Sequence, residues 1–407
     1  MDAKRGQAPS LAQVESHHLV QTAADLRPLL RASRDAMERE QRLSRSVVER
    51  MREAGLYRMT LPASFDGYGL DPVTFFRAVE LLAEGCGAVG WNAVNNGVIQ
   101  LITLGLPDSG VEEIYGRREH VVVAGTAIPG GGQAVPVPGG YRVTGRWSFG
   151  SGCQEAGWML ASFQILGEDG QPQRREADGG MFWRGVFRRE ETAVVPNSWD
   201  VAGLRGTGSF DWTVKDQFLP VHRTMTHAGA PLDNQWSRWP GITYQLPTVA
   251  WIGPHHSSVI TGIARAGLDA FVALACEKEP RGRSGILRDY PQAQDAMGRA
   301  DAMLDAGRAH RNAMLRALWD TLEAGGTISV AQKARMRLAS VFAADCARDA
   351  MDLAYRWGGS TSFKRDSRLA ACWQDLQVVG QTSTIGPEWY PIGGRALLGL
   401  DPGPRLS

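Results

Sequence analysis

The chain has 407 residues, of which 43% are hydrophobic, and its 44 basic and 43 acidic residues nearly cancel to a formal charge of +1. This length provides for two or three structural units with a sizeable core. The balanced charge excludes the strongly basic surface of a protein that binds nucleic acid or an anionic membrane.

The N-terminus lacks the apolar run of a signal peptide, and no segment approaches the roughly 18 uninterrupted apolar residues of a membrane-spanning helix. The five cysteines lie far apart and form no C-x-x-C pair, and the eight histidines show no H-x-x-x-H spacing. We therefore expect no metal site, no disulfide framework and a cytoplasmic location. Each histidine is expected to be a core or solvated side chain.

Residues 1–119 have the pattern of an N-terminal helical domain. Apolar residues recur at helical spacing in two segments, and Gly55 lies where the C-terminal cap of the second segment belongs. Asp71 is a favourable N-cap for a further helix, which would carry Pro72 at its first position.

Residues 120–225 change to short β-branched and aromatic runs separated by glycine-rich or charged turns. Gly139-Gly140 predicts a hairpin turn. The stretch HVVVAGTAIPGGG resembles the start of a dinucleotide-binding fingerprint, but the two prolines of the following QAVPVPGG exclude the helix that should hold the phosphates. We expect a loop there, within an antiparallel β-barrel domain.

The stretch GRWSFGSGC, residues 145–153, combines two aromatic residues with a serine between glycines. Trp147 and Phe149 are two residues apart, so on a regular strand their rings would share one face. Ser151 follows on a backbone that Gly150 and Gly152 leave open to close approach.

Residues 226–407 return to helical spacing. Four helices are expected, with starts near His255, Tyr290, Val330 and Leu369, and their small apolar residues indicate a four-helix bundle. The fold class predicted from the three regions is α+β, with helical domains on both sides of a central β-barrel.

This order resembles the acyl-CoA dehydrogenase fold over nearly the whole chain. The segments that carry the resemblance are LPASFDGYGLDP, GGYRVTGRWSFGSG, NSWDVAGLRGTGSFDWTVKDQFLP, YPQAQDAMGRADAMLDAGR and YRWGGSTSF with RLAACWQDLQ. Within the family, the W-x-F-x-S-G pattern at Trp147 is similar to that of the reduced-flavin-dependent monooxygenases.

The resemblance implies a two-component monooxygenase. It would take reduced FMN or FAD from a separate NAD(P)H-dependent flavin reductase. It would then oxygenate a small, flat, largely apolar organic substrate with O₂ through a flavin C4a-hydroperoxide. The resemblance also implies a homotetramer.

The same resemblance assigns roles to individual residues. Ser151, near flavin N5, and Thr382 are the expected catalytic residues. The expected cofactor contacts are Trp147, Phe149, Ser151, Gly152, Thr207, Ser209, Arg283, Gln294, Trp357, Gly358 and Gly359, the last five of them across a subunit interface. The expected substrate pocket contains Trp91, Asn95, Asn96 and Ser383, in an aromatic setting with Trp147 and Trp158.

The sequence departs from the family at its two bases. The N-terminal helix has Asn95, Asn96 and Ile99 where a histidine is usual, and Thr382 and Ser383 stand where a second histidine or the dehydrogenase glutamate belongs. One interpretation is a substrate that needs no deprotonation. The alternatives are a flavin-dependent dehydrogenase or oxidase, or a non-oxygenating flavin- or ligand-binding relative.

Overall fold

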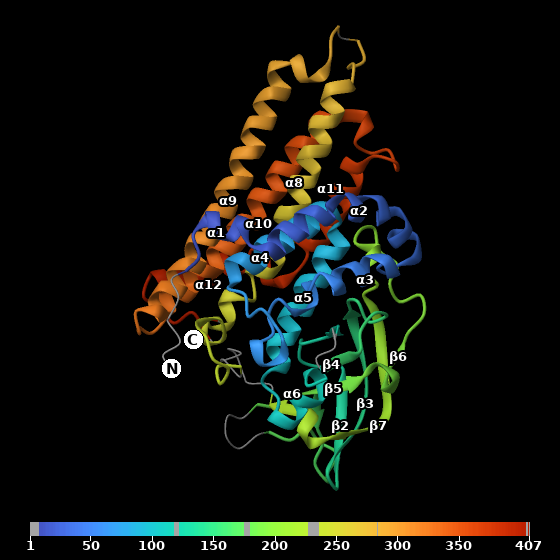
Figure 1. Cartoon of the computed structure of the whole chain (residues 1–407), viewed down its shortest axis with the longest axis vertical. Helices are drawn as coiled ribbons and strands as arrows, with labels where there is room; N and C mark the ends of the chain where they lie inside the picture. The colour runs from blue at the N-terminus through green and yellow to red at the C-terminus, as the bar shows by residue number, and fades with distance from the viewer. Residues whose placement is uncertain are drawn as a thin grey trace.

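The computed structural model describes residues 8–117, 122–174, 180–226, 236–282, 284–403 and 406. Arg283 and the predicted boundary at 119/120 lie outside the described residues, and the boundary at 225/226 falls inside the last strand. Figure 1 shows the sheet at one end of the molecule, the long C-terminal helices at the other, and the N-terminal helices between them. The three domains and the two boundaries between them stay predictions.

The N-terminal helices are confirmed. They are α1 (Leu11–Ser16), α2 (His18–Glu40), α3 (Arg45–Glu53), α4 (Pro72–Gly85), α5 (Gly87–Thr103) and α6 (Asp108–Tyr115). Asp71 caps α4 by accepting hydrogen bonds from the backbone N–H groups of Val73 and Thr74. Gly55 follows α3 in the left-handed conformation, with φ of 77°. Almost every residue of α4 and α5 is buried, so α5 can carry side chains into the interior.

The strands are β1 (Val123–Gly125), β2 (Gly132–Val137), β3 (Gly140–Gly150), β4 (Trp158–Ile165), β5 (Trp183–Arg188), β6 (Ala193–Val194), β7 (Phe210–Pro220) and β8 (Thr224–Thr226). They pair in the order β6-β7-β3-β2-β4-β5-β8, with β1 on β4. The predicted antiparallel barrel is wrong in strand direction, since β1 and β2 both run parallel to β4. In the described residues the sheet is also open, because β6 and β8 do not pair.

The predicted hairpin is confirmed, because Val137 and Gly140 face each other across the turn and Gly139 has φ of 81°. The predicted loop is confirmed only for residues 126–131, since β2 follows it. Pro136 is tolerated in β2 because the pairing with β4 involves only Gln133 and Ala134, which leaves an open edge beside the proline.

The C-terminal region contains the four expected long helices. Its helices are α7 (Ile242–Gln245), α8 (Pro254–Glu277), α9 (Pro291–Glu323), α10 (Val330–Gly358), α11 (Arg368–Gly380) and α12 (Trp389–Leu397). Their arrangement as a four-helix bundle stays a prediction. By length and composition alone, one described stretch, Thr248–Glu277, could cross a membrane. It contains α8, which packs against α4, α10 and α11 as a core helix does.

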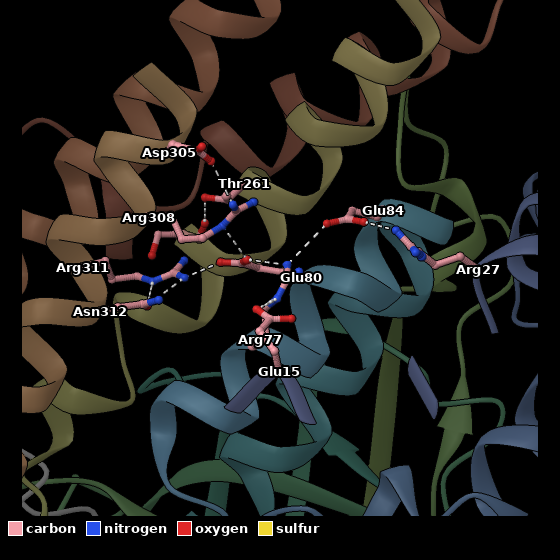
Figure 2. Close-up of polar contacts among 11 residues, drawn as sticks. Glu15, Arg27, Arg77, Glu80, Glu84, Thr261, Asp305, Arg308, Arg311 and Asn312 are labelled. Carbon is pink, nitrogen blue, oxygen red and sulfur yellow. Dashed lines mark hydrogen bonds and ion pairs between the residues drawn. The ribbon is translucent and has the colours of Figure 1, made fainter. Parts of the chain in front are cut away.

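A buried ion-pair network fixes α4 against α9 (Figure 2). The Glu80 carboxylate is fully buried and binds Arg311, which is 1% exposed, and Arg308 at 2.9 Å. Arg77 approaches it from the preceding turn of α4. Burial alone would raise the pKa of Glu80, but Arg311, Arg308 and Arg77 outweigh it and lower this pKa to about 2. The network holds the N-terminal helices in a fixed position relative to the C-terminal ones.

Candidate functional site

Strand β3 carries a β-bulge at the GRWSFGSGC stretch. Trp147 pairs with Trp212 and Gly150 with Phe210, so three steps on β3 oppose two steps on β7. Phe149 has φ of 63° and is 61% exposed, whereas Trp147 is buried and stacks on Trp212 at 4.6 Å. The expectation that the two rings share a face is therefore wrong. Trp147 supports the sheet from inside, and Phe149 lies on its outer surface.

The bulge places Ser151 at the end of a chain of hydroxyl groups. Its Oγ lies 2.7 Å from the Oγ of Ser209, which lies 2.7 Å from the Oγ1 of Thr207. Thr207 donates to the carbonyl oxygen of Leu204 at 2.8 Å. Thr207 and Ser209 are buried, and Ser151 is half-buried. The structure thus brings together the three hydroxyl residues that the sequence assigned to the cofactor.

The proton order along this chain is fixed by the Leu204 carbonyl. A carbonyl only accepts, and each hydroxyl has one proton and two lone pairs. All three contacts are therefore satisfied only when Ser151 donates to Ser209, Ser209 donates to Thr207, and Thr207 donates to Leu204. Ser151 accepts one further hydrogen bond at 2.9 Å from the indole Nε1 of Trp91. It retains one free lone pair and no free proton, so toward a ligand it is an acceptor.

Trp91 connects the hydroxyl chain to a histidine that the sequence analysis did not select. The Trp91 ring stacks on the His256 ring at 4.4 Å between centroids, with planes 7° apart. His256 lies in the first turn of α8, and its Nδ1 is 2.7 Å from the Oγ1 of Thr384. Its Nε2 is buried and has no hydrogen-bond partner. Because a buried imidazole nitrogen without a partner is unfavourable, this atom is suited to a ligand.

His256 is a neutral residue at physiological pH. Burial lowers the pKa of His256 to about 3. His255, stacked on it at 3.6 Å, has its pKa lowered by burial and by His256 itself. The sequence did contain a feature that could have indicated His256: two adjacent histidines directly after Gly253-Pro254, at the start of an apolar helix.

The two predicted residues at the C-terminal base position lie beside this cluster. Thr382 donates to the carbonyl oxygen of Val379, which closes the end of α11, and Ser383 is exposed. Thr384 instead carries the hydroxyl that reaches His256. The 3₁₀ turn over Ser383–Ile385 directs Thr384, and not the predicted Thr382 or Ser383, toward His256.

The predicted asparagines support the site from α5. Asn95 donates to the carbonyl oxygen of Trp91 at 2.9 Å, and Asn96 donates to that of Val123 at 3.2 Å. A third asparagine, Asn92, was missed, and it donates to the carbonyl oxygen of Thr207 while its Oδ1 remains buried and unpartnered. The N–H of Gly152 donates to the same Thr207 carbonyl, so these contacts position the Ser151 loop.

Trp158, expected in the same aromatic setting, lies elsewhere. Its ring is covered by the guanidinium groups of Arg188 and Arg223, 5.3 and 5.1 Å from its centroid. Of the three tryptophans expected around the substrate, Trp91 alone contacts Ser151 and His256. The aromatic character of this site therefore comes from Trp91 and the outward-facing Phe149.

The remaining predicted cofactor contacts lie at the far end of α8. A cavity of about 260 Å³ is lined by Lys278, Pro280, Arg281, Leu287, Tyr290, Trp357, Gly359 and Ser360. Lys278 donates to the carbonyl oxygen of Gly358, and Gln294 donates to that of Arg288 at 3.1 Å. Trp357 and Gly359 thus border a positively charged cavity, whereas Gln294 does not line it.

The residues around Ser151 fit a flavin ring. The end of β3 presents the exposed aromatic side chain of Phe149, and the turn that follows presents the half-buried hydroxyl acceptor of Ser151. Gly150 permits the close approach of β3 and β7, because a Cβ at this position would lie 2.8 Å from the Trp212 side chain on β7. The N–H group that a flavin gains at N5 on reduction would find its acceptor in Ser151.

The comparisons with known proteins identify the family. Residues 20–108 match the model of the acyl-CoA dehydrogenase N-terminal domain, and residues 255–385 match that of the C-terminal domain. Indole-3-acetate monooxygenase of Pseudomonas putida is 30% identical and covers 92% of both chains. The oxygenase subunit HsaA of Mycobacterium tuberculosis is 27% identical, over 98% of this chain and 99% of that protein.

Solved structures give the same result. The 3-HSA hydroxylase of Rhodococcus sp. RHA1 superposes with a TM-score of 0.86 at 27% identity, over 95% of this chain and 98% of that one. HsaA from M. tuberculosis gives a TM-score of 0.85 at 26% identity, over 96% and 99%. The chain therefore belongs to the acyl-CoA dehydrogenase family, in its branch of two-component flavin-dependent monooxygenases.

Proposed function

We propose that the protein is the oxygenase component of a two-component system and inserts one oxygen atom from O₂ into a small, flat, largely apolar aromatic molecule. Reduced flavin, when bound, supplies the activation of O₂ and the oxygen atom that is transferred. The observation that carries the proposal is the acceptor state of Ser151, set by the hydroxyl chain through Ser209 and Thr207.

Ser151 is suited to the reduced cofactor in particular. Reduced flavin carries a proton on N5, which needs an acceptor, whereas N5 of oxidised flavin is itself an acceptor. In the proton order of the chain, Ser151 offers only a lone pair. It therefore favours the reduced form, and it holds the N5 proton in place while oxygen transfer takes place.

The substrate side is formed by Trp91 and His256. The stacked ring pair supplies an apolar surface, and the unpartnered Nε2 of His256 supplies one polar contact for a ring N–H or hydroxyl group. Relatives are named indole-3-acetate monooxygenase, resorcinol hydroxylase and pigment production hydroxylase. We propose an indole- or phenol-type substrate for this chain, with no base required from Thr382 or Ser383.

The cofactor and the assembly are further parts of the proposal. His256 and Glu277 are 21 residues apart on α8, so the helix spans about 30 Å between them at roughly 1.5 Å per residue. The cavity at Lys278 and Trp357 therefore lies at the opposite end of α8 from His256 and the site at Ser151. We propose that it contributes to the flavin of a second copy in a homotetramer.

The experiment has two arms. The first titrates the purified protein with FMN and with FAD, each oxidised and anaerobically reduced, and measures the mass of the assembly by light scattering. A monomer would overturn the shared site. The second supplies NADH and an NADH-dependent flavin reductase and measures product with indole and resorcinol.

The proposal also includes a cytoplasmic location. The five cysteines lie in the described part of the chain and all are unpaired, which supports a reducing compartment.

A further inference from the structure

Two carboxylates hold the loop that anchors the hydroxyl chain. Asp375 of α11 is 3% exposed, and its Oδ1 accepts the backbone N–H of Leu204 at 2.7 Å. Glu38 of α2 accepts the N–H of Gly206 at 3.1 Å. Both N–H groups belong to the loop of residues 203–208. One N-terminal helix and one C-terminal helix thus each bind a backbone N–H of this loop.

The loop contains a backbone conformation that leucine rarely adopts. Leu204 has φ of 54°, in the left-handed region that is unfavourable for a residue with a Cβ. Such a conformation persists only when neighbouring contacts hold it. The loop also packs directly on α11, because a Cβ at Gly203 would lie 2.6 Å from the backbone of Gln374. The two carboxylates supply contacts that hold Leu204 in this conformation.

The conformation of Leu204 matters to the proposed active site through its carbonyl group. The Leu204 carbonyl oxygen accepts a hydrogen bond from the Thr207 hydroxyl at 2.8 Å. This contact fixes the order of protons from Thr207 through Ser209 to Ser151. Only the φ and ψ rotations separate the N–H and the carbonyl of one residue. A group that fixes the Leu204 N–H in the left-handed conformation therefore also fixes the direction of its carbonyl.

The two carboxylates share one arginine. Arg34 of α2 lies 3.7 Å from Oδ2 of Asp375. Burial raises the pKa of Asp375, although Arg34 and the Leu204 N–H act against it. Burial and Asp375 raise the pKa of Glu38 in the same way. Because a negative charge is not favoured at either position, what the loop requires from these residues is an acceptor oxygen, which an amide can also supply.

We propose that Asp375, assisted by Glu38, is a positioning residue for the oxygen transfer. It directs the Leu204 carbonyl toward Thr207 and thereby keeps Ser151 a hydrogen-bond acceptor. The proposal rests on the proposed function and deepens its cofactor side. Both carboxylates act through the hydroxyl chain, from helices that contribute no hydroxyl to it. A contact that only stabilised the packing of α11 on the loop would affect Tm without changing the preference for reduced flavin.

Asp375→Ala tests this role through the flavin preference. Once the Leu204 carbonyl is free to turn, Ser151 can donate to oxidised N5, and the ratio of the Kd for oxidised FMN to that for reduced FMN should fall about tenfold. The potential of bound FMN, measured by equilibrium reduction with a reference dye, should then be lower by about 30 mV. Asp375→Asn keeps an oxygen for the Leu204 N–H and should retain the wild-type ratio.

The control for stability is Glu84→Gln. Glu84 is a buried carboxylate of α4 that pairs with Arg27, so this variant should lower Tm and leave the ratio unchanged. Asp375→Ala with a lower Tm and an unchanged ratio would overturn the proposal. Glu38→Ala, at a half-buried position, should lower the ratio in the same direction, with Glu38→Gln as its conservative control. It decides the question if Asp375→Ala does not fold, and an unchanged ratio would overturn the proposal.

Ser209→Ala separates failure of this proposal from failure of the proposed function. This variant already interrupts the chain, so adding Asp375→Ala should change the ratio by less than about twofold. A further tenfold fall would overturn the proposal. If Ser209→Ala alone leaves the ratio unchanged, the proton order of the proposed function fails. The hold on the loop is then still measured by hydrogen exchange of residues 203–208, which Asp375→Ala, but not Asp375→Asn or Glu84→Gln, should accelerate. Equal exchange in the three variants would overturn it.

Discussion

The indole N–H of Trp91 donates to the Ser151 hydroxyl at 2.9 Å, across 60 residues of sequence and from helix α5 to the turn after β3. This contact joins the two parts of the site. On one side, Ser151 begins the hydroxyl chain through Ser209 and Thr207. On the other, the Trp91 ring covers His256. The cofactor and substrate groups are therefore held in one hydrogen-bonded and stacked unit.

Removing the middle of the hydroxyl chain should change which flavin the protein prefers. In Ser209→Ala, Ser151 loses the acceptor of its proton and becomes free to donate to oxidised N5. The ratio of the Kd for oxidised FMN to that for reduced FMN should fall about tenfold, the value of one buried hydrogen bond. Thr213→Ala on the same strand is the control, since its side chain contacts the Ala193 carbonyl. An unchanged ratio would rule out the proton order.

Ser151→Ala should uncouple oxygen use from product formation. Without the acceptor at N5, reduced flavin and O₂ yield more hydrogen peroxide, and product per NADH should fall about 10- to 100-fold, as expected from a loss of about 1–3 kcal/mol. The measurement is peroxide and product formed per NADH consumed. Ser148→Ala, at an exposed position on the same strand, should behave as the wild type. Equal coupling in both variants would remove Ser151 from the reaction.

His256→Phe tests the substrate contact, because it keeps a ring against Trp91 and removes both nitrogens. We expect KM for an indole substrate to rise about tenfold, with the Kd of reduced flavin unchanged. Thr384→Val should give a smaller increase, and Thr384→Ser should restore the wild-type value. Because burial lowers the pKa of His256 to about 3, kcat/KM should show no inflection from this residue between pH 5.5 and 8. A larger effect on flavin Kd than on KM would contradict the assignment.

Glu80→Gln should destabilise the protein by about 3–5 kcal/mol, because it leaves Arg311 buried without its counter-charge. The lowered pKa of Glu80, about 2, lies below its unfolded value, so this stabilisation is present above about pH 4.5 and is lost as pH falls toward 2. Urea unfolding at pH 7 and pH 3 measures both effects. Glu49→Gln, in an exposed pair with Arg45, should change stability by less than about 1 kcal/mol. Equal losses in the two variants would contradict this account.

Much of the fold was predictable from local chemistry. The Asp71 cap, the turn at Gly139-Gly140 and the four long C-terminal helices are encoded by nearby residues. The parallel pairing of β1 and β2 with β4 was not predictable, because it depends on which strands meet after a long excursion of the chain. That the sheet stays open was not predictable either, because it depends on whether the end strands β6 and β8 meet.

The site was predictable only in part. Ser151, Thr207 and Ser209 were identified by resemblance and do meet. The face of Phe149 was mispredicted, because the period-two rule fails at a bulge whose extra residue is visible only against β7. His256 was missed because its partners, Trp91 and Thr384, are more than 120 residues away. Only the packing of α8 against α5 and against the 3₁₀ turn Ser383–Ile385 brings them together.

The central claim is that the protein transfers oxygen from O₂ to an aromatic substrate. The most direct measurement is product analysis by mass spectrometry after turnover under ¹⁸O₂, with a flavin reductase, NADH, FMN and an indole substrate. The account predicts a product that carries one labelled oxygen atom in the wild type and a much lower yield of it in Ser151→Ala. A product without label, or desaturation of an acyl thioester with an artificial electron acceptor in its place, would contradict it.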